Sequence, residues 1–236
     1  MSYKRILLKL SGETLGGADG VGLDSEVMGG FAAQVAAVAK SGTQIAIVIG
    51  GGNIFRGLSG VTDGFDRVRG DQMGMLATVI NSIGFSLSLR RQGVKADVFT
   101  ATPMRPIAKY YMRDEVLEYM ESGGIALVAG GTGNPFFTTD SGAALRACEL
   151  HCDALFKGTK VDGVYDSDPK KNSSAKKFET ISFDEAIRRE LHVMDQTAFT
   201  LCKENDVPIV VFNINEEGML AKVVEGGGVC STVKNV

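Results

Sequence analysis

The stretch IALVAGGTGNPFFTTDSGAALRACELH, residues 125–151, decides the fold. It opens with IALVA, a continuous apolar run that is typical of a strand buried on both faces. It closes with a helical pattern in which Thr139, Asp140 or Ser141 can cap the first turn. Between the two lies the glycine-rich turn GGTGNPFF, residues 130–137. A strand, such a turn and a helix N-terminus predict an anion site, because amides and the helix dipole then face one point; otherwise the glycines only turn the chain.

Similar apolar runs flank this stretch on both sides and predict further buried strands. They are RILLKL (5–10), IAIVI (45–49), ADVF (96–99), ALFKG (154–158) and IVVF (209–212), with a short edge strand around 229–232. Helical patterns alternate with them, after Asp24, from Asp71, and over 114–120, 183–191, 196–205 and 216–225. This alternation predicts an α/β fold in which helices cover both faces of a mostly parallel sheet. No linker-like stretch divides the chain, so we expect a single domain.

Two segments carry more specific expectations. The long helix from Asp71 has one apolar face, made of Leu76, Val79, Ile80, Ile83 and Leu87. The segment 162–177 is polar, lysine-rich and broken by a proline, which predicts a loop. A solvated surface explains its lysines better than a clamp for phosphates does.

Composition and charge exclude several classes of function. The 236 residues carry a net charge of −3, which gives no support for wrapping nucleic acid, so any phosphate binding must be local. No apolar run approaches the roughly 20 residues of a membrane span. The apolar core of the start, MSYKRILLKLSG, is too short for a signal peptide. We therefore expect a cytoplasmic protein that binds neither nucleic acid nor a membrane.

The cysteines raise the question of a metal site. Cys148 and Cys152 lie four residues apart with His151 beside them, a spacing that can hold an ion. There is no CxxC pair, and the only other histidine is His192. We therefore expect reduced, packed thiols and no metal site.

The carboxyl ends of the predicted strands carry residues of one chemical kind. They are KLSG (9–12), GGGN (50–53), GGTGNPFFTT (130–139) and KGTK (157–160), with Arg56 close by. In an open parallel sheet these ends meet at one edge, where ligands bind. Glycine lets the backbone approach phosphate oxygens, lysine adds a point charge and arginine a bidentate grip. The combination predicts a phosphate-handling site.

Absent motifs narrow the chemistry. The chain contains no GxxxxGK[ST], no GxGxxG that opens a helix, and no HRD or DFG, which argues against P-loop, dinucleotide-binding and protein-kinase sites. Phosphoryl transfer needs positive charge on the migrating group and an aligned acceptor. An acceptor that is already an anion needs no general base, which fits a site without an obvious histidine.

Six segments resemble the amino-acid-kinase superfamily, and within it the bacterial-type uridylate (UMP) kinases. They are KRILLKLSGE (4–13), VIGGGNIFRG (48–57), GDQMGMLAT (70–78), GTGNPFFTTDS (131–141), KVDGV (160–164) and VMDQTAFTL (193–201). The resemblance implies a three-layer α/β/α sandwich, with ATP carrying Mg2+ as phosphoryl donor and UMP as acceptor. It also implies a homohexamer, with GTP and UTP as possible effectors. The single domain, 1–236, would hold UMP roughly in 1–150 and ATP roughly in 151–236.

The resemblance also assigns residues to two binding sets. The ATP-binding set is Lys9, Leu10, Ser11, Gly12, Gly52, Arg56, Thr159, Tyr165 and Asp168. The UMP-binding set is Gly51, Arg56, Asp71, Thr132, Gly133, Asn134, Pro135, Phe136, Phe137, Thr138 and Thr139. Within the second set, Arg56 would grip the phosphate, Asp71 would bind a ribose hydroxyl, and Thr139 would lie near the base.

Three residues are expected to carry catalysis. By the resemblance, Lys9 and Lys157 would neutralise charge on the migrating phosphoryl group, and Asp140 would hold both lysines in register. Capping is the competing explanation, because Asp71, Asp140 and Asp195 all lie where a helix N-cap is wanted. Two other functions stay open: a kinase of carboxylates or carbamates on the same fold, and a silent nucleotide sensor. The former enzymes lack the TGNPFFTT loop, and the three catalytic residues argue against the latter.

Overall fold

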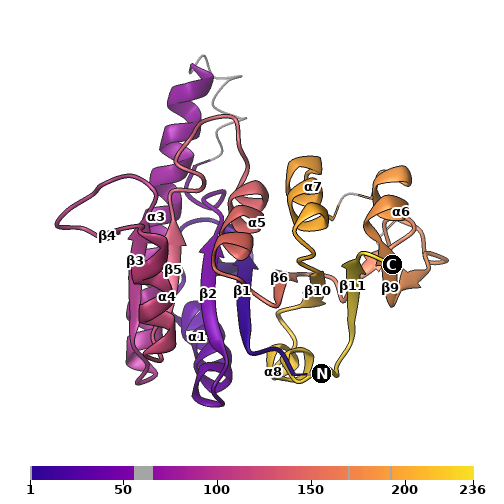
Figure 1. Ribbon diagram of the computed structural model, residues 1–236, viewed down its shortest axis with the longest axis horizontal. Coiled ribbons are helices and arrows are strands. Elements are labelled where there is room, and N and C mark those ends of the chain that lie inside the picture. The colour runs from indigo at the N-terminus through magenta and orange to yellow at the C-terminus, as the bar shows by residue number, and fades with distance from the viewer. Residues whose placement is uncertain (1, 56–65, 170, 192) are drawn as a thin grey trace.

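A nine-stranded sheet forms the middle layer of the computed structural model, which describes residues 2–55, 66–169, 171–191 and 193–236. Helices cover both faces of this sheet (Figure 1). The strand order is β4-β3-β5-β2-β1-β6-β10-β11-β9, and every neighbouring pair in it is parallel except β10 and β11. The predicted α/β fold with a mostly parallel sheet is confirmed.

The strands follow the apolar runs of the sequence. Their bounds are β1 Arg5–Leu10, β2 Gln44–Ile49, β3 Ala96–Thr100, β4 Lys109–Tyr110, β5 Ile125–Ala129, β6 Ala154–Thr159, β9 Thr180–Ser182, β10 Ile209–Asn213 and β11 Cys230–Lys234. All five residues of β5 are buried, as expected of a strand that is covered on both faces. Two short strands, β7 Val164–Tyr165 and β8 Lys177–Phe178, form a separate antiparallel hairpin.

The helices divide into two layers. Their bounds are η1 Gly12–Leu15, η2 Gly17–Asp19, α1 Ser25–Lys40, α3 Arg67–Arg91, α4 Arg113–Glu121, α5 Thr139–Glu149, α6 Phe183–Arg188, α7 Gln196–Glu204 and α8 Met219–Val224. Apolar residues of α1, α3 and α8 pack on one face of the sheet. Those of α4, α5, α6 and α7 pack on the other. The carboxyl ends of the central strands therefore open between α3 on one side and α5 on the other.

Two expectations about the C-terminal half were wrong. The last strand, β11, lies inside the sheet between β10 and β9, so β9 forms that edge instead. The segment 162–177 is not all loop, because its ends pair in the β7–β8 hairpin. A strand of two residues has too few alternating positions to be recognised as a strand.

Helix α3 departs most from its sequence pattern. It begins at Arg67 and is capped by Asp66, so Asp71 lies inside the helix and is not its cap. The expected apolar face is largely at the surface, since Leu76 and Ile80 are each 49% exposed. Val79 and Ile83 of that face do pack on the core, with Phe85 and Leu89. The buried face also carries polar residues, Thr78, Asn81, Ser82, Ser86 and Ser88. Hydrophobic periodicity therefore predicted the buried face only in part, because α3 packs partly on loops whose backbone groups need hydrogen-bond partners.

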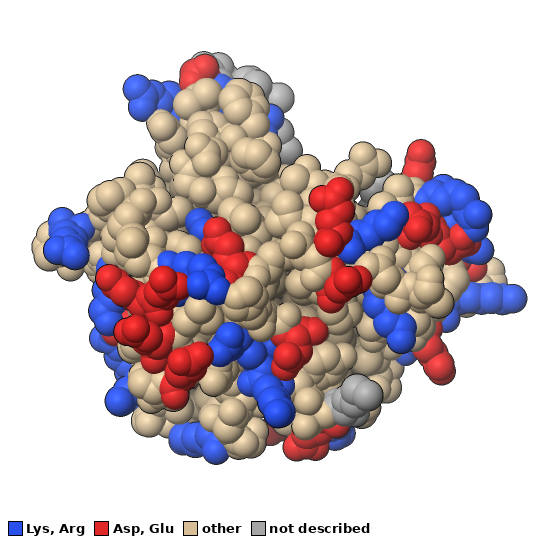
Figure 2. Space-filling view, viewed as in Figure 1, with Lys and Arg blue, Asp and Glu red and all other residues tan. Residues whose placement is uncertain are grey.

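Surface charge is mixed. On the face drawn in Figure 2, lysine and arginine side chains are interspersed with aspartate and glutamate and do not gather into one basic field. Among the helices that the structure describes, only α3 is long and apolar enough to cross a membrane. Half of its apolar window is buried inside the protein, as in the core helix of a soluble protein.

Candidate active site

Two lysines and one aspartate form the centre of the candidate site. Lys9 of β1 and Lys157 of β6 lie directly opposite each other in a parallel strand pair. Because side chains alternate along a strand, both lysines point to the face that α5 covers, as Leu7 and Leu155 do. Asp140, in the first turn of α5, binds both: Lys9 Nζ is 2.7 Å from its Oδ1, and Lys157 Nζ is 2.9 Å from its Oδ2.

The electrostatics of this cluster are set by burial and by close opposite charges. Each of the three side chains is between 12% and 16% exposed. Burial disfavours the ionised carboxylate of Asp140, but the ammonium groups of Lys9 and Lys157 outweigh it and hold its pKa below the ordinary value. Burial also lowers the pKa of Lys157, whose Nζ donates a further hydrogen bond to the carbonyl of Val193. Two cations on one anion leave positive charge, which suits a phosphoryl group in transit.

The residues that precede α5 and α7 tie these two helix ends together. Thr138 caps α5, because its Oγ1 accepts from the amides of Asp140 at 3.1 Å and Ser141 at 3.2 Å. The hydroxyls of Thr138 and Ser141 both donate to the carboxylate of Asp195. Asp195 in turn caps α7 by accepting from the amide of Ala198. The expected cap was therefore placed too late in the sequence, and capping does not explain Asp140, whereas it does explain Asp195.

The glycine-rich loops approach one another so closely that two glycines leave no room for a side chain. A Cβ on Gly12 would lie 2.2 Å from Asn53 Oδ1 and 2.3 Å from Gly50 O. A Cβ on Gly51 would lie 2.7 Å from the carbonyl oxygen of Gly74 in α3. All three distances are far inside van der Waals contact, so both positions require glycine.

Two cavities lie next to the cluster, and Lys157 lines one of them. The α3 cavity, about 400 Å³, is lined by Gly51, Gly52, Phe55, Arg67, Gly70, Asp71, Gly74, Met75, Thr78, Gly131, Thr132, Asn134, Phe137, Thr138 and Thr139. The hairpin cavity, about 540 Å³, is lined by Lys157, Thr159, Val161, Gly163, Val164, Tyr165, Asp166, Ser167, Asp168, Pro169, Arg189, Glu190, Leu191, Val193 and Val211. Asp140 links the two cavities, because it follows Thr139, which lines the α3 cavity, and binds Lys157, which lines the hairpin cavity.

Comparison with known proteins identifies the family. The profile of the amino acid kinase family matches residues 4–213. The chain belongs to the amino acid kinase family. A protein named uridylate kinase from Parabacteroides distasonis is 54% identical over 233 residues, which is 99% of each chain. The protein of the same name from Porphyromonas gingivalis is 51% identical and covers 99% of this chain and 98% of its own.

Solved structures agree with this member of the amino acid kinase family in fold. The UMP kinase of Bacillus anthracis has a TM-score of 0.96 at 35% identity, over 100% of this chain and 97% of that one. The UMP kinase of Ureaplasma parvum has a TM-score of 0.93 at 36% identity, over 100% of both chains. The resemblance to bacterial-type uridylate kinases and the amino-acid-kinase sandwich expected from it are confirmed.

Most residues expected to bind UMP lie together. Seven of them line the α3 cavity: Gly51, Asp71, Thr132, Asn134, Phe137, Thr138 and Thr139. Three others do not line it: Gly133, Pro135 and Phe136. Phe136 has a positive φ of 70° and an exposed side chain, but its amide donates to Asp71 Oδ2 at 2.8 Å and so fastens the loop to α3. Arg56 lies outside the described residues.

The residues expected to bind ATP are more scattered. Three line the hairpin cavity: Thr159, Tyr165 and Asp168. Three lie at the end of β1: Lys9, which belongs to the lysine pair, and Ser11 and Gly12, which follow the strand. Gly52 lines the α3 cavity instead. Leu10 is fully buried in the core, so only its backbone can serve a ligand.

Sequence reasoning missed most of what α3 contributes to this kinase fold. Five α3 residues outside the predicted sets line the α3 cavity: Arg67, Gly70, Gly74, Met75 and Thr78. Gly70 and Gly74 are four residues apart, the spacing of one helix face, so their pattern was a usable signal. Arg67 pairs with Asp71 and its guanidinium lies 5.3 Å from the ring centre of Phe136. No local pattern marks that contact, because Phe136 comes from a distant segment.

The cysteines are all unbridged thiols. Burial raises the pKa of Cys152 and of Cys202 to about 12, which makes both poor nucleophiles. Within the described residues, no group of three or more His, Cys, Asp and Glu side chains is placed to hold a metal ion.

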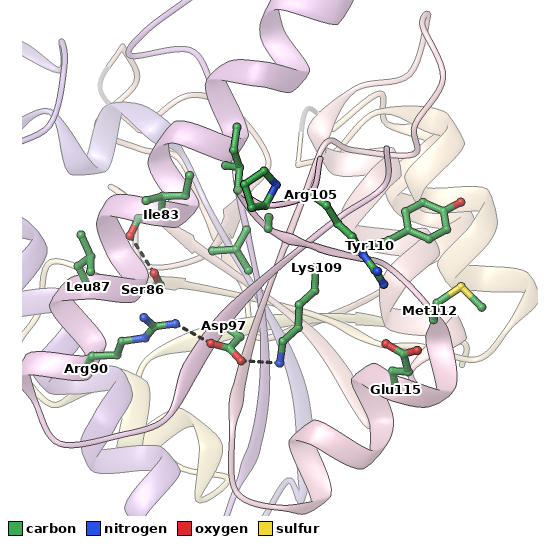
Figure 3. A pocket seen from close by; sticks show the side chains of 14 residues that line it. Ile83, Ser86, Leu87, Arg90, Asp97, Arg105, Lys109, Tyr110, Met112 and Glu115 are labelled. Atoms are coloured by element: carbon green, nitrogen blue, oxygen red, sulfur yellow. Dashed lines mark hydrogen bonds and ion pairs between the residues drawn. The ribbon is translucent and has the colours of Figure 1, made fainter. Parts of the chain in front are cut away.

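A third cavity, about 810 Å³, is larger than the other two but contains none of the candidate site residues. It lies between α3, β3 and residues 105–112 (Figure 3). Asp97 accepts from Arg90 and from Lys109 there, and these two cations hold its pKa below the ordinary value against the opposing effect of burial. Size alone therefore does not locate the chemistry, which follows the lysines and the glycine-rich loops.

Proposed function

We propose that this chain is a UMP kinase, which transfers the γ-phosphoryl group of ATP to UMP and releases UDP and ADP. The observation that carries the proposal is the cluster of Lys9, Asp140 and Lys157 between the α3 cavity and the hairpin cavity. Nucleotides that occupied the two cavities would bring their reacting phosphates together at this cluster. The relatives that carry the name uridylate kinase support the same acceptor.

The cluster would act through charge and alignment. The phosphate of UMP is already ionised at neutral pH, so its attacking oxygen needs no general base. Lys9 and Lys157 would neutralise the charge that spreads over the migrating phosphoryl group. Asp140 would hold both ammonium groups in place and would exchange no proton with the substrate.

The two substrates would divide the single domain. UMP would occupy the α3 cavity, roughly within 1–150, and ATP the hairpin cavity, roughly within 151–236. Arg56 would grip the UMP phosphate, and Asp71, which lines the α3 cavity, would bind a ribose hydroxyl. Mg2+ would arrive with ATP as part of the substrate.

A panel of acceptors tests the proposal. ADP release is measured in a coupled assay with UMP, CMP, acetate, glutamate and carbamate as acceptors, at saturating MgATP. We expect UMP to give the highest kcat/KM by far. Preference for a carboxylate or carbamate would assign the chain to another kinase of the same fold. If no acceptor supports ADP release, the result would indicate a nucleotide sensor.

Thr139→Ala is expected to narrow the ratio of kcat/KM for UMP over CMP by a factor on the order of ten, because a site built to pair with one base edge leaves groups unpaired with the other. Thr139 lines the α3 cavity, and Thr138 caps α5 in its place, so the helix start should survive the substitution. Steady-state rates on the two nucleotides give the ratio. A ratio equal to that of the unchanged protein would remove Thr139 from base recognition.

Assembly and control rest on the family resemblance. The exposed apolar residues of α3, Met73, Leu76, Ile80 and Leu87, would be covered in a homohexamer. Control by GTP and UTP, a cytoplasmic location and the lack of nucleic-acid or membrane partners are proposed on the resemblance and the composition alone.

A further inference from the structure

The inward face of α3 carries three polar side chains that are bonded to the glycine-rich loops of the site, two to the loop 130–137 and one to the loop 50–53. Asp71 accepts from the Phe136 amide, Thr78 accepts from the Gly130 amide, and Asn81 donates to the Gly50 carbonyl. Spacings of seven and three residues keep the three side chains on one side of the helix. The stripe therefore joins both glycine-rich loops to a single rigid element.

Thr78 uses its whole hydroxyl in this arrangement. Its side chain lies on the buried face, where Oγ1 accepts from the amide of Gly130 at 2.8 Å and donates to the carbonyl of Met75 at 2.6 Å. Gly130 has a φ of 80° and begins the turn that lines the α3 cavity. Removal of the hydroxyl leaves a buried amide without its acceptor, and the turn must then move to find another.

Asn81 binds a different loop, the one that follows β2. It is completely buried, and its Nδ2 donates to Gly50 O and to Asn53 Oδ1, each at 2.7 Å. Asn53 Nδ2 donates back to Asn81 Oδ1 at 3.0 Å and also donates to Gly22 O. Gly12 sits against this amide pair with no room for a Cβ. Asn81 therefore fixes the loop after β2 against the loop after β1.

We propose that Thr78 and Asn81 are positioning residues for phosphoryl transfer, with separate effects on binding and on chemistry. The inference rests on the proposed UMP kinase activity. Thr78 sets the acceptor turn alone, so its loss weakens UMP binding. Asn81 sets the distance between the loop that begins at Gly50, on the UMP side, and Gly12, on the ATP side. Its loss therefore misaligns the two phosphates, which slows the chemical step more than it weakens binding.

The first experiment compares Thr78→Val with Thr78→Ser and Ser88→Ala. The valine variant keeps the side-chain volume and should raise KM for UMP on the order of tenfold, with KM for ATP and kcat changed less than twofold. The serine variant restores the hydroxyl and should restore KM. Ser88 is a buried α3 residue whose hydroxyl donates only within the helix, to Gly84, so its alanine variant should match the unchanged protein. Equal KM values for Thr78→Val and the unchanged protein would overturn the role of Thr78.

The second experiment is a double-mutant cycle on the amide pair. Asn81→Ala and Asn53→Ala should each lower kcat on the order of a hundredfold, and the double variant should be no slower than the worse single one, because the two side chains act as one unit. Effects on kcat that multiply, or a loss confined to KM, would contradict the role given to Asn81. An Asn81→Ser variant, which keeps a polar hydroxyl group at the buried position, repeats the test if the alanine variant does not fold.

A readout without substrate separates this inference from the proposed function. Hydrogen exchange at the Gly130 amide, followed in the peptide that contains it, should speed up in Thr78→Val and return to normal in Thr78→Ser. Unchanged exchange overturns the inference, whatever the activity. Exchange that speeds up in Thr78→Val and recovers in Thr78→Ser, in a protein that makes no UDP from UMP, would instead reject the proposed function and leave the loop-holding role of Thr78 intact.

Discussion

Asp140→Asn is expected to lower kcat for UDP formation by a factor of about a hundred or more, with small changes in both KM values. An asparagine of the same shape can accept hydrogen bonds through one oxygen only, whereas Asp140 now meets Lys9 with one oxygen and Lys157 with the other. The two ammonium groups would then repel each other and lose the alignment that the transition state needs. Steady-state rates with UMP and ATP varied in turn measure the split between kcat and KM.

The pH dependence of this variant distinguishes an organising residue from a general base. The pKa of Asp140 is held below its ordinary value of 3.8, so the group is already ionised wherever the enzyme is assayed. The acidic limb of the rate profile must then come from other groups, such as the substrate phosphates, and should persist in Asp140→Asn. Disappearance of that limb would show that Asp140 titrates as a base.

The alkaline limb of the pH–rate profile of Asp140→Asn should move to lower pH. The carboxylate of Asp140 opposes the burial that lowers the pKa of Lys157. Without this carboxylate, the pKa of Lys157 falls further, and activity should decline at a lower pH than in the unchanged protein. Asp184→Asn is a matched control, because Asp184 also binds a lysine, Lys203, but at the surface and far from the cluster in sequence. The Asp184→Asn variant should keep the kcat of the unchanged protein and both limbs of its pH–rate profile.

Stability should respond to acid in the same sense. A carboxyl group whose pKa is depressed on folding stabilises the protein above its unfolded pKa, near 3.8, and loses that contribution as pH falls through the folded value. Asp140→Asn should therefore cost about 3 kcal/mol at neutral pH, because it leaves buried ammonium groups uncompensated, and less at an acid pH at which the carboxyl group of the unchanged protein is protonated in the folded state. Urea unfolding at the two pH values measures the difference.

Gly12→Ala is expected to lower kcat/KM on the order of a hundredfold and to destabilise the fold by about 1–3 kcal/mol. The added Cβ would lie 2.2 Å from Asn53 Oδ1 and 2.3 Å from Gly50 O, and the second of these is backbone, so the two loops must separate. The cause is crowding alone, because the φ of Gly12 is not in the left-handed region. Activity and thermal midpoints measure the two effects.

Gly29→Ala provides the control for this substitution. Gly29 lies inside α1, and a Cβ there meets nothing within 4 Å. Alanine is the better helix former, so this variant should gain about 0.5–1 kcal/mol of stability and keep its activity. Full activity in Gly12→Ala would show that the loops can part without harm to the chemistry.

The sheet could be read from the sequence because its strands are short apolar runs between glycine-rich turns. The position of the α5 cap could not be read, since Thr138, Thr139, Asp140 and Ser141 are all able to cap a helix and local propensity does not rank them. Tertiary contacts decide which residue caps α5: Asp195 accepts a hydrogen bond from the hydroxyl of Thr138, and Asp140 forms ion pairs with two lysines.

The buried side of α3 could be predicted only in part, since Val79 and Ile83 of the expected face do pack on the core. Periodicity assumes that a helix turns its apolar residues to the core, but this helix faces backbone groups that need hydrogen-bond partners. Thr78 and Asn81 supply those partners, while Leu76 and Ile80 remain at the surface. The pattern at the strand ends placed Lys9 and Lys157 at one edge of the sheet, but Asp140 was joined to them only through the family resemblance, because no local pattern reveals that a side chain of α5 meets those of β1 and β6.

The register of β1 and β6 sets Lys9 opposite Lys157, so the spacing of the two charges is determined by the central strands of the sheet. Slippage by a single residue would turn one lysine to the other face of the sheet, so no small distortion can tune the distance. β1 and β6 each have neighbours on both sides, and their separation requires the sheet to come apart. The β7–β8 hairpin pairs with no strand of that sheet and is joined to it by the hydroxyl of Ser231 in β11, which accepts from the Val164 amide and donates to the Phe178 carbonyl. The wall of the hairpin cavity therefore depends partly on side-chain hydrogen bonds, whereas the positions of Lys9 and Lys157 depend on the pairing of the central strands.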